Sequence, residues 1–106
     1  MWIYLIEQQG TNLYKIGISK NPEERVKQLQ TANGVKLDLI KQFKTEFDYK
    51  LERVLHRHFQ SKKTIGEFFE LNENDVKEFT SLCESRESNF KYLVENNSYI
   101  RNRGKF

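Results

Sequence analysis

The sequence predicts an α/β fold of the α+β type, in which a small three-stranded antiparallel sheet is packed by helices and carries a short C-terminal helical appendage. Two apolar runs, 2–7 and 13–18, have strand character, and the segment between them contains Gly10 and Asn12, which suit a hairpin turn. A third run, 35–43, alternates between apolar and polar residues, as a strand does. The other apolar residues recur mostly at helical spacing.

Helices are expected at 21–32, at about 46–60 and from 74 onwards. Asn21 suits an N-cap and Pro22 suits the first helical position, whereas Asn33-Gly34 ends the first helix. The buried stripe of the second helix is expected to be Phe47, Leu51, Val54, Leu55 and Phe59. Residues 66–71 are expected to be a short strand or extended segment. We expect one domain over 1–84, followed by a C-terminal helix and a frayed basic tail over 85–106.

The distribution of charge is more informative than its total. The formal net charge is only +3, but residues 41–63 hold seven Lys or Arg against three acidic residues, and residues 100–106 hold three against none. Basic stretches of this kind fit a polyanion partner, although a solvated surface gives the same pattern.

Composition also excludes several classes of protein. Cys83 is the one cysteine, which excludes an intrachain disulfide and favours a reducing compartment. Together with His56 and His58 it provides too few ligands for a structural zinc site. No apolar run approaches the roughly 20 residues of a membrane span, and no signal peptide precedes the first strand. We therefore expect a cytoplasmic protein without a membrane partner.

A symmetric hairpin register would place Glu7 opposite Asn12 and therefore Tyr4 opposite Lys15. Directly opposite side chains share one face of the sheet, with Cβ atoms about 5 Å apart. A phenol and an amine on an otherwise apolar hairpin indicate a functional site. Gly17 lies in the same strand, where a glycine usually marks a close approach of substrate or of the following helix.

The chain resembles the GIY-YIG nucleases in five strings that occur in the family's order. These are Trp2-Ile3-Tyr4, Lys15-Ile16-Gly17, Arg25 with the string from Leu29 to Asn33, the string from Leu51 to His56, and the string from Gly66 to Leu71. The last three resemble the compact phage and bacterial branch of the family, and the resemblance covers residues 2–79. It departs from the family pattern at Lys15, where tyrosine is usual.

The resemblance implies roles for individual residues. Tyr4 and Lys15 would position or deprotonate the attacking water, and Arg25 would neutralise the scissile phosphate. Glu52 would hold one Mg²⁺ (or Mn²⁺), which needs few protein ligands, and His56 would carry protons or support Glu52. Glu67 is the rival carboxylate.

The implied function is divalent-metal-dependent hydrolysis of DNA phosphodiester bonds, with one strand nicked per active site. The expected substrate-binding residues are Gly17, Lys41, Lys44, Arg53, Arg57, Lys62 and Lys63. A homodimer or a protein partner is left open. The alternative is a non-catalytic module that binds DNA or protein on the same scaffold, since few residues remain for a separate specificity domain.

Overall fold

A computed structural model of the chain describes residues 1–64 and 66–96. Its four strands form one antiparallel sheet in the order β3-β1-β2-β4. The strands are β1 (Trp2–Gln8), β2 (Leu13–Ser19), β3 (Leu37–Lys44) and β4 (Phe69–Glu70). The helices are α1 (Pro22–Thr31), α2 (Asp48–His58), the 3₁₀ turn η1 (Gln60–Lys62) and α3 (Glu73–Asn96). The α+β class is confirmed, but the expected three-stranded sheet has a fourth, two-residue strand.

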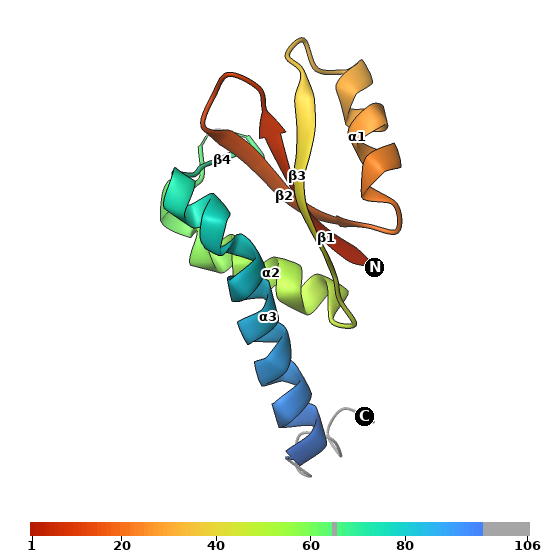
Figure 1. Ribbon diagram of the computed structural model, residues 1–106, viewed down its shortest axis with the longest axis vertical. Helices are drawn as coiled ribbons and strands as arrows, with labels where there is room; N and C mark the ends of the chain where they lie inside the picture. Colours follow the sequence, from red (N-terminus) through yellow and green to blue (C-terminus); the bar gives the residue numbers. More distant parts are fainter. Residues whose placement is uncertain (65, 97–106) are drawn as a thin grey trace.

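Helices cover both faces of the sheet (Figure 1). α1 packs on one face, over a small core of Tyr4, Ile6 and Leu37. α2 and α3 pack on the other face, where a larger core includes Ile3, Leu5, Ile16, Leu51, Leu55, Phe69 and Phe79. The alternation along β1 explains this division, because successive side chains point to opposite faces of a strand.

The hairpin register differs from the expected one by two residues. Glu7 lies opposite Tyr14, and Tyr4 lies opposite Gly17 rather than Lys15. The Tyr14 hydroxyl donates a 2.9 Å hydrogen bond to Glu7, and the turn is closed by Thr11 N–H donating to the Gln8 carbonyl. Because the shift is even, every side chain keeps its face.

A β-bulge explains why the apolar residues of β3 serve both cores. The pairing of β1 with β3 shifts between Leu5 and Ile6, so that Lys41 lies opposite Leu5 but Leu39 lies opposite Ile6. An extra residue in one strand interrupts the regular pairing and bends the strand. Leu39 therefore packs beside α1, whereas Phe43 packs into the larger core.

The helix starts agree closely with the sequence signals. Asn21 caps α1 by accepting a hydrogen bond from Glu24 N–H. α3 runs unbroken across residue 84, where the domain was expected to end. Its C-terminal half extends away from the sheet (Figure 1). The division at residue 84 stays a prediction, and the tail from residue 97 lies outside the described residues.

Cys83 belongs to the larger core. Cys83 is fully buried, and burial raises the pKa of its thiol to about 12. Within residues 1–64 and 66–96, no helix is long and apolar enough to cross a membrane.

Candidate active site

The sheet leaves part of one edge open beside α2. β4 pairs only with Leu13 and Tyr14, so the rest of β2 has no strand neighbour on that side among the described residues. α2 packs against this part of β2, and His56 Nε2 lies 2.8 Å from the Ile16 carbonyl oxygen. Since a carbonyl only accepts, Nε2 is the donor, and in a neutral ring Nδ1 keeps its lone pair.

A pocket of about 360 Å³ opens at this edge, and we call it the candidate site. Its polar lining comes from β1, β2, α1, α2 and the segment between η1 and β4. These residues are Tyr4, Lys15, Gly17, Arg25, Glu52, His56, Lys63 and Glu67, with Ile16 and Ile18 beside them. The structure thus brings all five predicted catalytic residues to one concave surface.

Gly17 is required because the Tyr4 ring lies across it. A Cβ atom added to Gly17 would stand 2.5 Å from Cζ of Tyr4 and still closer to its hydroxyl oxygen. The close approach was expected from substrate or helix, but its partner is the phenol of the facing strand. The missing side chain at Gly17 therefore gives the Tyr4 phenol its place in the pocket wall.

Lys15 reaches the same pocket from a diagonal position. It lies opposite Ile6, two residues along β2 from Gly17, so it shares a face with Tyr4 as a diagonal neighbour. Its ammonium forms a 2.6 Å ion pair with Glu67. The Lys15 side chain is 13% exposed and that of Glu67 is 78% exposed. Hydrogen bonding and charge from Lys15 hold the pKa of Glu67 below its usual range, and Arg25 and Lys63 lower it further.

This ion pair was not foreseen. The sequence marks Glu67 only as a rival of Glu52, and no local signal links residues 15 and 67, which are distant in the chain. In the structure Glu67 is engaged with a cation, whereas Glu52 has no hydrogen bond or ion pair with another described residue.

Arg25 and His56 are held in different ways. Arg25 is half-buried in the first turn of α1 and donates a 3.3 Å hydrogen bond to the Gln28 side chain. Its guanidinium has no ion pair with a described residue, so its charge is available to an anion. The His56 ring is fixed by the Ile16 carbonyl and by an edge contact with Phe69, with ring centroids 5.2 Å apart.

The predicted substrate-binding cations separate into three places. Lys63 lines the candidate site, and it also lines an adjoining groove with Arg53 and Arg57. Lys62 is paired with Asp75 and lines neither pocket. Lys41 and Lys44 lie on β3, the strand at the opposite edge of the sheet.

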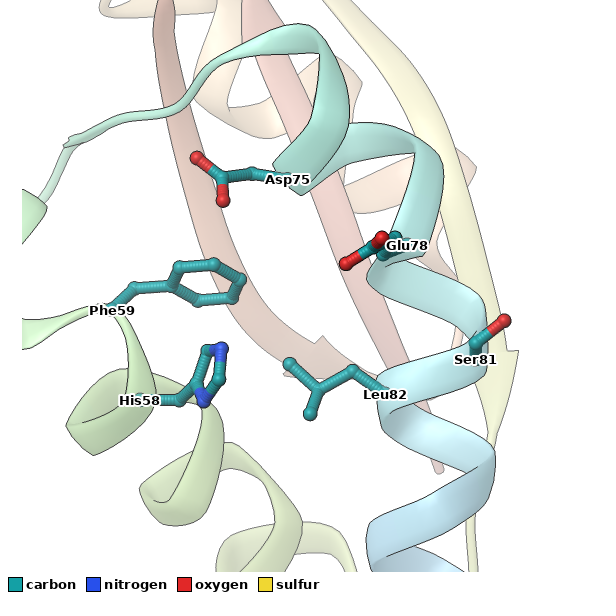
Figure 2. A pocket seen from close by; sticks show the side chains of 6 residues that line it. All are labelled: His58, Phe59, Asp75, Glu78, Ser81 and Leu82. Atoms are coloured by element: carbon teal, nitrogen blue, oxygen red, sulfur yellow. The ribbon is translucent and has the colours of Figure 1, made fainter.

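A second pocket of similar size, about 370 Å³, lies between the end of α2 and α3. Figure 2 shows Phe59 and His58 on one side and Leu82 on the other, with Asp75 and Glu78 nearby. Its helical spacing from Leu51 and Leu55 predicts a packed histidine at residue 58, but His58 is exposed at the end of α2 and touches Phe59 edge-on. Among the residues that the structure describes, two carboxylates and no Lys or Arg line this pocket, so it suits an anionic ligand poorly.

The donor set of the candidate site fits a hard divalent cation bound largely by non-protein ligands. Glu52 offers a carboxylate without a protein partner among the described residues. Mg²⁺ usually keeps several waters and binds through one or two carboxylates together with substrate phosphate. No group of three or more His, Cys, Asp or Glu in the described residues could hold a metal ion. These residues therefore do not form a metal site made of protein ligands alone. They are compatible with Mg²⁺ or Mn²⁺ bound by Glu52 together with water and substrate oxygens.

Fold and site together define a small α+β domain with a polar, cation-rich pocket at one sheet edge. The chain belongs to the T5orf172 domain family, whose family model matches residues 1–84. This is a phage-associated family of nuclease-like type, which suggests a DNA-interacting domain. No curated protein and no solved structure matches the chain.

Proposed function

We propose that this protein is a GIY-YIG-type endonuclease that hydrolyses DNA phosphodiester bonds with the help of Mg²⁺ or Mn²⁺. One observation carries the proposal: a phenol, an ammonium, a guanidinium, a free carboxylate and an imidazole from four separate elements line a single pocket. Three cationic side chains in that lining favour an anionic substrate. With one such pocket in the described part of each chain, the first product would be a nick in one strand.

The pocket residues divide the work of hydrolysis. The Arg25 guanidinium would bind two oxygens of the scissile phosphate and stabilise the charge that grows in the transition state. Glu52 would hold the cation, which when bound would polarise a phosphoryl oxygen and add positive charge there. The Tyr4 hydroxyl and the Lys15 ammonium would hold the attacking water.

Hydrolysis also requires a proton acceptor. The water oxygen forms a bond to phosphorus, one phosphoester P–O bond breaks, and the proton released by the water must go to a base. Lys15 is a cation engaged with Glu67, which suits positioning better than proton removal. The free Nδ1 of neutral His56 would take the proton. Its Nε2–H would meanwhile stay hydrogen-bonded to the Ile16 carbonyl oxygen. The same histidine could then return a proton to the leaving oxygen.

The test is cleavage of supercoiled plasmid DNA with added Mg²⁺ or Mn²⁺ by the wild-type protein and by Glu52→Gln. The amide keeps the volume of the side chain but removes its charge, so cleavage should fall to background. Glu46→Gln is the matched control, because Glu46 is exposed and lies outside the pocket lining. Circular dichroism checks that both variants fold.

Each result assigns a different role to the chain. Cleavage near the wild-type rate in Glu52→Gln would overturn the metal role of Glu52. An inactive wild-type protein that still binds DNA would favour the alternative function, a non-catalytic DNA-binding module on the same scaffold.

A further inference from the structure

The groove that adjoins the candidate site is a second place where anions could bind. It has a volume of about 270 Å³ and is lined by Arg53, His56, Arg57, Gln60, Lys63 and Phe69. Three of these six residues are cationic and none is acidic. Neither Arg53, Arg57 nor Lys63 has an ion pair within residues 1–64 and 66–96. No ion pair in this part of the protein therefore neutralises their charges.

The groove adjoins the candidate site, because two residues line both. His56 and Lys63 line both pockets. The His56 ring is held from one side by the Ile16 carbonyl and from the other by the edge contact with buried Phe69. The histidine is therefore a fixed part of both linings, and a ligand bound in one pocket lies next to the other pocket.

α2 contributes a pair of side chains to each pocket, and His56 lines both. Glu52 and His56 are four residues apart and both line the candidate site, whereas Arg53 and Arg57 are four residues apart and both line the groove. Residues four apart lie on the same side of a helix, about 6 Å apart along its axis. One helix thus carries a carboxylate–imidazole pair beside a pair of arginines.

We propose that the groove formed by Arg53, Arg57 and Lys63 binds a backbone phosphate of the substrate strand adjacent to the scissile phosphate. Arginine suits this role because its planar guanidinium donates two parallel hydrogen bonds to phosphate oxygens. This inference rests on the proposed function for the identity of the neighbouring phosphate. If the groove binds this phosphate, the substrate is a polynucleotide strand with at least two consecutive phosphates. The bound strand then runs along α2.

The first experiment measures binding without cleavage. A labelled DNA duplex is titrated in EDTA at several salt concentrations, with the double variant Arg53→Gln and Arg57→Gln. The control is the double variant Lys77→Gln and Lys91→Gln, which removes the same charge from exposed positions on α3. On duplex DNA, the slope of log K against log salt becomes shallower by about 0.9 for each phosphate that the protein no longer neutralises.

Because the groove would hold one phosphate, we expect the arginine variant to reduce the salt slope by about 0.9 and the affinity at least tenfold, with little change in the lysine variant. Equal losses in both variants would overturn the inference, since only net charge would then matter. All four residues are exposed, so folding is not expected to change, and thermal unfolding checks this.

The second experiment locates the phosphate. Oligonucleotides carrying one neutral methylphosphonate at successive positions are tested against the wild type and the arginine variant. At the position that contacts the groove, neutralisation should weaken wild-type binding but leave the arginine variant unchanged. An identical profile for the two proteins would overturn the inference.

The two experiments separate this inference from the proposed function. A selective loss of affinity in the arginine variant of a protein that never cleaves DNA would support the phosphate groove and reject hydrolysis. Metal-dependent cleavage with no selective loss of affinity would reject the groove and leave hydrolysis standing.

Discussion

The two edges of the sheet are both basic, but they differ in what surrounds their charges. At the β3 edge, Lys41 and Lys44 belong to a strand of eight residues and line neither the candidate site nor the groove. At the β2 edge, the short β4 leaves backbone open to α2, and five elements or segments place polar groups around one pocket. Cations therefore lie on an open surface at one edge and around a pocket at the other. The difference arises because neighbouring helices and loops surround only the β2 edge with polar groups.

After the loss of cleavage expected in Glu52→Gln, the largest expected effect at the β2 edge comes from Arg25. In Arg25→Gln we expect kcat/KM for DNA cleavage to fall by about 10²–10³, as when one preorganised charge stabiliser is removed. Lys27→Gln, an exposed residue of the same helix outside the pocket lining, is the control. Similar rates in the two variants would mean that Arg25 has no specific role in cleavage.

The second expected effect is structural. Gly17→Ala should lower the free energy of unfolding by about 1–3 kcal/mol, because the new methyl group collides with the Tyr4 ring in a packed region. Gly34→Ala is the control, since a Cβ atom there has no neighbour within 4 Å. Urea unfolding of both variants gives the comparison. An unchanged stability in Gly17→Ala would show that the ring can leave its position without cost.

Glu67→Gln tests how the ion pair with Lys15 acts on substrate. The Glu67 carboxylate lines the pocket and repels the substrate phosphate, so its removal should lower KM by about fivefold, equivalent to one charge pair in a watery environment. Lys15 would lose its anchor, and kcat should fall as well. Glu70→Gln on neighbouring β4 is the control, because Glu70 does not line the candidate site. A rise in KM would contradict this repulsion.

The same ion pair has a predictable pH dependence. The folded-state pKa of Glu67 is lowered from 4.5, so its contribution to stability is present above that value and disappears as pH falls through the lowered pKa. Glu67 is largely exposed, which makes the contribution small. The difference in unfolding free energy between wild type and Glu67→Gln should therefore be constant around neutral pH and vanish in acid. If this difference in unfolding free energy grew on acidification, the pKa of Glu67 would be raised in the folded state and not lowered.

The smallest effect is expected at the β3 edge. Lys41→Gln combined with Lys44→Gln should reduce DNA affinity less than the Arg53 and Arg57 pair of substitutions does, as measured by the same titration in EDTA. A larger loss of affinity would extend the DNA-binding surface across the sheet and remove the contrast between its edges.

The sequence by itself determined which residues could belong to the candidate site and which face of the hairpin they occupy. The alternation of β1 and β2 placed Tyr4 and Lys15 on one face even though the expected register was wrong by two residues. That agreement follows from the two-residue period of a strand, which makes every even shift equivalent for the choice of face. The start of α1 was also predictable from the sequence, because capping by Asn21 is a local interaction.

Only the tertiary structure decided how those residues meet. The contact of Tyr4 with Gly17 depends on the register, and the ion pair of Lys15 with Glu67 depends on the return of the chain through β4. The division of the cations between the groove and the far edge depends on the strand order β3-β1-β2-β4. These contacts join residues far apart in the sequence, and local propensity carries no information about which distant groups will be brought to the same edge.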